Sequence, residues 1–191
     1  MNGLLFIRHA ETEMSGRFCG HSDPPVNARG ERQISALIAR LAPETIDAVY
    51  CSNLRRAVVT ADALAKALSV PVTRRRGLRE IGFGDWEGLT WAEIEQRNPG
   101  EARQWMEAFP NLPAPGGESF ADFEDKVLDE VEHLLLLAEH KRIAVVTHGG
   151  VMRVVLRALH GCSDKDAWDK TKSYCCSFAC ANGVAPRMMS R

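Results

Sequence analysis

The architecture follows from the stretch Leu4-Leu5-Phe6-Ile7-Arg8-His9, close to the N-terminus. Four large apolar residues in a row predict a strand that is buried on both faces, as in a parallel sheet. The pair Arg8-His9 then lies at the carboxyl end of that strand, which is the edge where open α/β sheets bind ligands. Arginine offers a planar fork to phosphate oxygens, and a neutral imidazole can attack phosphorus. The dipeptide alone fits two solvated side chains equally well, so its meaning depends on the rest of the chain.

Length and composition set the limits of this interpretation. The chain has 191 residues, of which 45% are hydrophobic and 26% are charged, and its net charge is −1. These values predict one soluble globular domain over 1–191. The small net charge gives no general attraction to nucleic acid or to an anionic membrane, so an anion site must be local. No apolar run approaches the ~20 residues of a membrane span, and the N-terminus lacks the layout of a signal peptide, so we expect a cytoplasmic protein.

Helix and strand patterns alternate along the chain. Apolar residues at steps of three and four predict helices over 28–41, 54–68, 91–98, 101–108, 120–138 and 151–159. Short apolar runs predict strands at 4–7, 47–51, 70–72, 143–147, 174–180 and 183–188. This alternation implies right-handed crossovers and predicts a three-layer α/β/α fold with a mostly parallel central sheet.

Three of these strands lead into cationic or imidazole side chains. The first strand ends in Arg8-His9, the second leads into Arg55 and Arg56 in a first helical turn, and the strand at 143–147 ends at His148. Because the carboxyl ends of parallel strands share one edge, we expect two arginines and two histidines around one point. Such groups repel one another unless a dianion lies between them, so a small-molecule phosphate monoester is the predicted partner. The pattern does not choose between the two adjacent arginines.

Turnover of such an ester needs a nucleophile, charge stabilisation and a proton for the leaving oxygen. His9 can attack, and the arginines and His148 can stabilise charge. Glu80, in a glycine-rich loop, is a candidate proton donor, a role that contributes ~10²–10⁴ in rate. The segment 82–118 is expected to cover the site, with Phe83 and Trp86 as apolar contacts for the leaving group, although burial in a core explains the tryptophan equally simply.

Cysteines and a run of arginines carry weaker signals. No pair of cysteines has the Cys-x-x-Cys spacing of a zinc site, and Cys176 and Cys180 alternate with polar or small residues, so we predict small buried thiols. The alternative is a metal site built from Cys19, His21 and one of these thiols. The run 74–76 is expected to be a solvated turn of three arginines without a role.

Four separated segments complete the sequence evidence. They are Arg8-His9-Ala10-Glu11-Thr12, Ser52-x-Leu54-x-Arg56-Ala57, Leu78-x-Glu80 with Gly84-x-Trp86-Glu87-Gly88, and Thr147-His148-Gly149-Gly150. In this order they resemble the histidine phosphatases, the phosphoglycerate mutase-like superfamily. The resemblance implies that His9 is phosphorylated, that Arg8, Arg56 and His148 hold the phosphoryl group, and that Glu80 donates the proton. It implies no metal and no other cofactor.

Within that superfamily, the short length, the loop 82–87, the segment 117–120 and Trp168 are most similar to the bacterial α-ribazole phosphatases, which act on a nucleotide-like intermediate of cobalamin assembly. The resemblance favours hydrolysis. A broad-specificity phosphatase, mutase-type phosphoryl transfer and a phospholigand-binding protein without turnover are the alternatives. No nucleic-acid or membrane partner is expected, and a homodimer is left open.

Three positions depart from the usual pattern of the superfamily. Ala10 stands where glycine is common, so its methyl group lies beside His9. Pro25-Val26-Asn27 replaces the more usual Pro-Leu-Thr, which makes Asn27 a candidate for a phosphate contact. Ser15 replaces a common asparagine and is a candidate substrate contact for the same reason.

Overall fold

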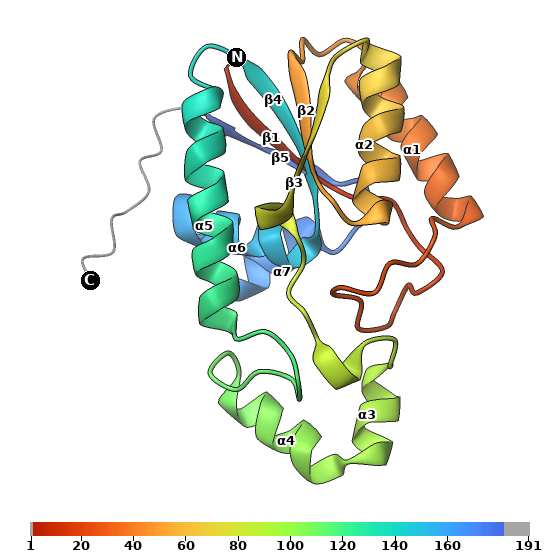
Figure 1. The fold of residues 1–191 in the computed structure, drawn as a ribbon, viewed down its shortest axis with the longest axis vertical. Helices are drawn as coiled ribbons and strands as arrows, with labels where there is room; N and C mark the ends of the chain where they lie inside the picture. Colours follow the sequence, from red (N-terminus) through yellow and green to blue (C-terminus); the bar gives the residue numbers. More distant parts are fainter. Residues whose placement is uncertain (1, 182–191) are drawn as a thin grey trace.

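The computed structural model describes residues 2–181 as a sheet with helices on both faces (Figure 1). The strand order is β3-β2-β4-β1-β5, with bounds β1 (Gly3–Arg8), β2 (Ala48–Ser52), β3 (Val72–Arg75), β4 (Arg142–Thr147) and β5 (Ser177–Ala181). All neighbours are parallel except β5, which is antiparallel to β1. The helices are α1 (Ala28–Leu41), α2 (Arg55–Leu68), η1 (Arg76–Leu78), η2 (Gly84–Trp86), α3 (Trp91–Arg97), α4 (Pro99–Ala108), α5 (Phe120–Leu137), α6 (Gly149–His160) and α7 (Asp164–Thr171). The predicted fold class is confirmed.

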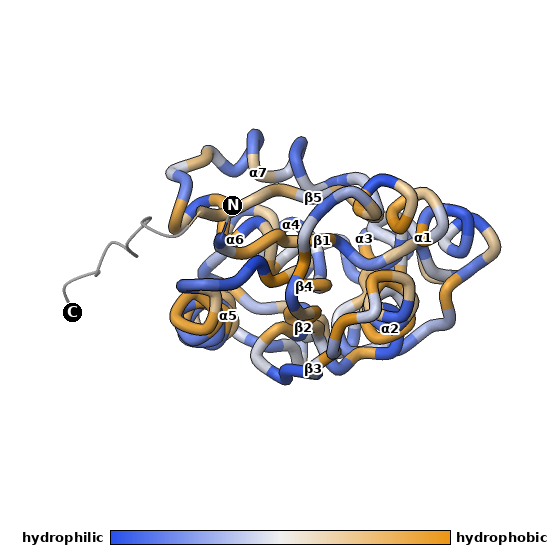
Figure 2. Tube along the Cα trace, turned by 90° about the horizontal axis from the view of Figure 1, so that it is seen from above, coloured by the Kyte–Doolittle hydropathy of each residue, from blue (hydrophilic) through white to orange (hydrophobic). Residues whose placement is uncertain are grey.

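The central strand β1 accounts for both helical layers. Its side chains alternate between the two faces of the sheet, as successive residues of a strand do. Leu4 and Phe6 pack with buried residues of α5 and α6, whereas Leu5 and Ile7 pack with α1 and α2. Figure 2 shows the apolar strands in the middle of the molecule with helices to either side. Burial on both faces explains why the strand is a continuous apolar run.

Residues 82–118 form a separate extension, which we call the cap and which lies at the bottom of Figure 1. It holds η2, α3 and α4 and has its own small core. Trp86, Ile94, Ala102 and Ala114 are buried together there, and half-buried aromatic rings surround them. The cap lies on the side of the sheet toward which the parallel strands run, so it borders the edge where the predicted site residues gather.

Helix α7 is absent from the prediction. Its buried residues are Ala167 and Thr171, and its large apolar side chain, Trp168, is 55% exposed. A helix of eight residues with so few buried positions has no apolar stripe, which is the signal that predicts the other helices. The strand predicted at 183–188 lies outside the described residues.

The third strand also differs from its prediction. It covers Val72–Arg75, later than the predicted 70–72, so it includes two arginines of the run 74–76. The prediction of a solvated turn is wrong because β3 is an edge strand, where charged side chains are tolerated. Arg75 pairs with Glu130 of α5 at 2.7 Å, which fastens this edge to the neighbouring helix.

The six cysteines are free thiols, as the sequence predicts. Cys51, Cys175 and Cys180 are buried. Burial raises the pKa of Cys51 to about 12 and that of Cys175 to about 11, so both thiols stay protonated at neutral pH. These side chains therefore act as small packing groups.

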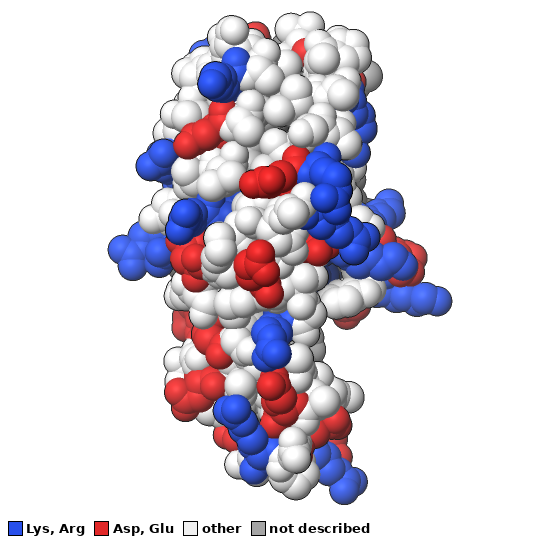
Figure 3. Space-filling view, turned by 90° about the vertical axis from the view of Figure 1, so that its right-hand side faces the viewer, with Lys and Arg blue, Asp and Glu red and all other residues white. Residues whose placement is uncertain are grey.

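The outer surface carries charges of both signs. On the face drawn in Figure 3, acidic and basic side chains are interspersed. Within residues 2–181, none of the helices combines the length and the hydropathy of a membrane-spanning segment.

Candidate active site

The carboxyl ends of β1 and β4 bring three predicted site residues together. Arg8 pairs in register with Thr147, and the N–H of His9 donates to the carbonyl of Thr147 at 2.9 Å. His9 and His148, which follow these two strands, therefore lie side by side, and the centroids of their rings are 5.0 Å apart. Arg56, from the first turn of α2, is 1% exposed. We call Arg8, His9, Arg56 and His148 the phosphate pocket, after the ligand that the sequence predicts for them.

His9 is held in one tautomer. Its Nδ1 lies 2.7 Å from the carbonyl oxygen of Ala10, and because a carbonyl only accepts, Nδ1 carries the proton. The lone pair therefore lies on Nε2. The N–H of Ala10 donates to the hydroxyl of Thr60 at 3.1 Å, which fixes the same turn. The methyl group of Ala10 packs in the core beside α1 and α2. The core therefore accommodates the alanine that stands where glycine is common.

His148 is fully buried, and within residues 2–181 neither ring nitrogen has a hydrogen-bond partner. Burial lowers the pKa of His9 and of His148 well below 6.5, and the charge of Arg56 lowers both further. Both imidazoles are therefore neutral at neutral pH. A neutral imidazole at this place offers one lone pair and one N–H, which suits attack on phosphorus by one ring and donation to a phosphoryl oxygen by the other.

The two arginines are fixed by backbone carbonyls. Nη1 of Arg8 donates to the carbonyls of Thr171 and Lys172 at 3.0 and 2.6 Å, and its guanidinium lies 4.2 Å from the ring centre of Tyr174. Arg56 donates to three carbonyls of the loop 19–22. In the part of the chain that the structure describes, the Nε atoms of both arginines are buried without a partner. Two buried N–H donors with uncompensated charge are the donor set that a phosphate dianion requires.

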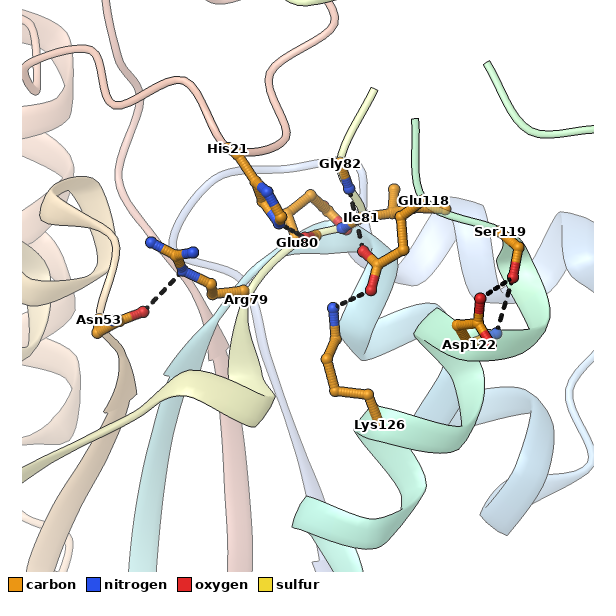
Figure 4. Close-up of polar contacts among 10 residues, drawn as sticks. All are labelled: His21, Asn53, Arg79, Glu80, Ile81, Gly82, Glu118, Ser119, Asp122 and Lys126. Atoms are coloured by element: carbon orange, nitrogen blue, oxygen red, sulfur yellow. Dashed lines mark hydrogen bonds and ion pairs between the residues drawn. The ribbon is translucent and has the colours of Figure 1, made fainter. Parts of the chain in front are cut away.

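Glu80 reaches the same edge from the loop before the cap. It is 9% exposed, and its Oε2 accepts the N–H of Gly150 at 2.9 Å while Oε1 accepts the N–H of Ile81 at 3.1 Å. A Cβ at Gly150 would clash with this carboxyl group, so a side chain there would displace the Glu80 carboxyl group from its position. Figure 4 shows His21 above Glu80, where its Nε2 lies 3.1 Å from the Glu80 carbonyl oxygen. The carboxyl group is thus positioned next to the first turn of the helix that follows His148.

A second carboxylate joins the two ends of the cap and ties them to α5. Glu118 accepts the N–H of Gly82 at 3.2 Å and the ammonium group of Lys126 at 2.6 Å, as Figure 4 shows. On the other side of Glu80, Nε of Arg79 donates to Asn53 at 2.9 Å. The backbone around Glu80 is therefore tied both to α5 and to the start of α2.

The four candidate substrate contacts have different surroundings. Ser15 is exposed, and its hydroxyl lies 3.3 Å from that of Tyr174, close to His9. Asn27 caps α1 through the N–H of Gly30 and donates to Glu11 and Thr12, so a phosphate contact would require these bonds to break.

Phe83 and Trp86 belong to the aromatic cluster of the cap. The ring of Phe83 packs edge-on against that of Phe18, with centroids 4.9 Å apart. Trp86 is 4% exposed and lies 5.2 Å from the ring of Trp105. Packing inside the cap therefore accounts for Trp86, whereas Phe83 is half-buried at the margin of the same cluster.

Two residues near the pocket are missing from the sequence-based prediction. The ring of Tyr174 lies 5.7 Å from that of His9 and beneath the Arg8 guanidinium, but its segment has no pattern that singles it out. Arg153 extends back along α6, so that its Nη1 lies 3.1 Å from the position that a Cβ of Gly149 would take. Burial lowers the pKa of Arg153. Arg153 and Arg157 interrupt an otherwise apolar helical run, which was the signal available for this residue.

The alternative metal site is not supported. The thiol of Cys19 donates to the carbonyl of Ser22, and the imidazole of His21 contacts the carbonyl of Glu80. Among residues 2–181, no three His, Cys, Asp or Glu side chains are grouped so that they would hold a metal ion. These two residues belong instead to the loop that surrounds Arg56.

Comparisons with known proteins agree with this arrangement. A family model described as histidine phosphatase superfamily (branch 1) matches residues 4–180. The chain is 32% identical to phosphoserine phosphatase 1 of Hydrogenobacter thermophilus, with 94% of this chain and 82% of the relative covered. It is 30% identical to the adenosylcobalamin/α-ribazole phosphatase of Escherichia coli, with 86% and 82% covered. The crystal structure of the α-ribazole phosphatase from Shigella flexneri superposes with a TM-score of 0.83 at 28% identity, covering 95% of this chain and 91% of that one.

Proposed function

The chain belongs to the histidine phosphatase superfamily, branch 1, and we propose that it hydrolyses small phosphate monoesters through a phosphohistidine formed on His9. That it is a phosphatase follows from the family and from its similarity to phosphatases of several substrates. The observation that carries the proposed route is a neutral His9 with its lone pair on Nε2, next to buried N–H groups of Arg8, Arg56 and His148 that have no hydrogen-bond partner within residues 2–181. Binding alone would need no such nucleophile.

In the first step, Nε2 of His9 attacks phosphorus, and the P–O bond to the leaving group breaks. The two arginines and His148 donate hydrogen bonds to the non-bridging oxygens, whose charge must be balanced throughout the transfer. Glu80, in its protonated form, gives its proton to the departing oxygen. The products of this step are a free alcohol and a phosphohistidine.

In the second step, water attacks the phosphohistidine. Glu80 is now a carboxylate and accepts a proton from that water as the P–N bond breaks. Nε2 recovers its lone pair, and inorganic phosphate is released. The backbone N–H groups of Ile81 and Gly150 hold the carboxyl group in place for both proton transfers.

For the leaving group, we propose α-ribazole 5′-phosphate as the first candidate substrate. Support comes from the relative in Escherichia coli and from the superposition on the Shigella flexneri enzyme, which are described as α-ribazole phosphatases. The similarity to a phosphoserine phosphatase favours a second class, small esters that carry a carboxylate. A broad-specificity enzyme would accept both classes, and a mutase would return the phosphoryl group to an organic acceptor instead of water.

A substrate panel tests this assignment. Phosphate release is measured from α-ribazole 5′-phosphate, L-phosphoserine and p-nitrophenyl phosphate, and conversion of 3-phosphoglycerate to its 2-isomer is measured alongside. We expect the highest kcat/KM for α-ribazole 5′-phosphate, no isomerisation, and unchanged rates in the presence of a chelator. A higher kcat/KM for phosphoserine would overturn the substrate assignment alone, whereas no phosphate release from any ester would overturn the proposed hydrolysis.

A further inference from the structure

The carboxylate of Glu87, in the cap, binds four backbone N–H groups from two loops. It accepts from Gly20 at 3.0 and 3.1 Å, from His21 at 2.8 Å, and from Ser22 and Phe83 at 3.1 Å each. Within residues 2–181, no cationic side chain forms an ion pair with it. Burial raises its pKa, but hydrogen bonds from the backbone donors and from the Ser22 side chain outweigh burial and keep the pKa below the ordinary value, so Glu87 is charged at neutral pH.

The same loop is bound from its other side by Arg56. Nη1 of Arg56 donates to the carbonyl of Ser22 at 2.6 Å, and Nη2 donates to those of Gly20 at 2.7 Å and Cys19 at 3.2 Å. In a trans peptide the C=O and N–H groups point in opposite directions. Two peptide units are bound in this way, the one between Cys19 and Gly20 and the one between Gly20 and His21. In each, the C=O group accepts from the guanidinium of Arg56 and the N–H group donates to the carboxylate of Glu87.

This arrangement aligns two peptide dipoles between two opposite charges. The carbonyl ends face Arg56 and the N–H ends face Glu87, so each charge stabilises the orientation that the other requires. Gly20 makes the close approach possible, because a Cβ there would clash with the carbonyl of Ile81 and lie 2.5 Å from the Glu87 carboxylate. The position of the guanidinium in the phosphate pocket thus depends on a carboxylate that lies beyond the loop.

We propose that Glu87 is a positioning residue for phosphate binding, which acts through the loop 19–22 on the guanidinium of Arg56. The loop accepts three of the five N–H groups of this guanidinium, and the buried Nε is among those left for the phosphoryl group. The inference rests on the proposed function only in taking phosphate as the ligand of the pocket. The competing explanation is that Glu87 stabilises the cap without any effect on phosphate.

Binding of inorganic phosphate separates these explanations, because it does not depend on turnover. Calorimetric titration of the full chain should give a Kd for Glu87→Gln that is about 10-fold to 100-fold higher than for wild type. The reason is that a neutral amide cannot accept four N–H groups, so charge-assisted hydrogen bonds are lost. Glu87→Asp keeps the charge and should recover most of the affinity. Glu93→Gln is the matched control, because Glu93 lies in the same cap and binds only Thr90 and Arg17.

A double-mutant cycle shows whether the effect passes through Arg56. In the Arg56→Ala background, Glu87→Gln should weaken phosphate binding by less than about 2-fold, because the group that it positions is gone. An equal penalty in both backgrounds, or a wild-type Kd in Glu87→Gln protein that melts at a lower temperature, would overturn the positioning role and leave the proposed function intact. A wild-type chain that binds no phosphate would overturn the proposed function together with this inference.

Discussion

The phosphate pocket and the cap border the same sheet edge but are held together by different forces. The side chains of the pocket are polar, and all but the half-buried Arg8 are buried; backbone carbonyls of distant segments fix Arg8 and Arg56. The cap is held by a cluster of aromatic rings, and it leaves Met106 and Phe109 61% and 52% exposed. Hydrogen bonds are directional and fix atoms to about a few tenths of an ångström, whereas apolar contacts tolerate the replacement of one side chain by another of similar volume.

This difference predicts that the pocket and the cap have different roles. We expect the pocket to carry out phosphoryl transfer, because that reaction requires fixed geometry. We expect the cap to select among leaving groups, because it places apolar packing surface beside the pocket. The two regions should therefore respond differently to substitution.

Removal of a pocket cation should affect all substrates alike. Arg56→Ala should lower kcat/KM by about 10³-fold for every ester, because loss of one charged donor to the transferring group has effects of this size. Arg55→Ala is the matched control, since its neighbouring guanidinium is exposed, and it should change kcat/KM by less than about 2-fold. Steady-state kinetics with two unrelated esters measures both variants. A similar loss in the two variants would contradict the assignment of the phosphate contact to Arg56 alone.

Glu80→Gln should distinguish between leaving groups by their chemistry. An alkyl ester needs a proton on its departing oxygen, so its kcat should fall by about 10²–10⁴-fold. An aryl ester such as p-nitrophenyl phosphate leaves without that proton and should lose much less. The value of kcat is measured for each ester at a saturating concentration. Equal losses of kcat for both esters would show that Glu80 is not the proton donor.

A substitution in the cap should change selectivity and spare phosphate binding. Trp105 is half-buried between Trp86 and Phe109, at ring distances of 5.2 and 5.1 Å. Trp105→Ala should change the ratio of kcat/KM between a bulky ester and p-nitrophenyl phosphate by about 10-fold, as the loss of an apolar contact does. Its inhibition constant for inorganic phosphate should stay at the wild-type value. A changed phosphate constant with an unchanged ratio would reverse the roles assigned to the two regions.

The buried histidines should make stability depend on pH. Because their pKa values in the folded chain lie below 6.5, the unfolded chain binds more protons between those values and 6.5. The free energy of unfolding should therefore rise with pH across this window, by up to about 1.4 kcal/mol per pH unit for each histidine. Urea unfolding of His148→Gln should show a shallower slope than wild type between about pH 5 and 7. Equal slopes would mean that His148 is not kept neutral by the pocket.

The sequence predicted best where a pattern and a physical cause coincide. The apolar runs of β1 and β4 and the stripes of α1 and α5 follow from burial, so both layers of the fold were predictable. The gathering of Arg8, His9, Arg56 and His148 followed from the shared edge of parallel strands.

The misses have a common origin in contacts that leave no periodic mark. Helix α7 buries too few residues to show a stripe, and β3 is an exposed edge. The carbonyls that hold Arg56, and the N–H groups that bind Glu87, are backbone atoms whose positions depend on the folded loop. Residue types alone do not encode such contacts.

The most direct test of the account is the capture of the phosphoenzyme. Wild-type protein is denatured at neutral to alkaline pH during turnover of p-nitrophenyl phosphate, and its peptides are analysed by mass spectrometry. The account predicts one acid-labile phosphoryl group on the peptide that contains His9, and neither label nor turnover in His9→Ala. A phosphoryl group on another residue, or turnover that persists in His9→Ala, would contradict it.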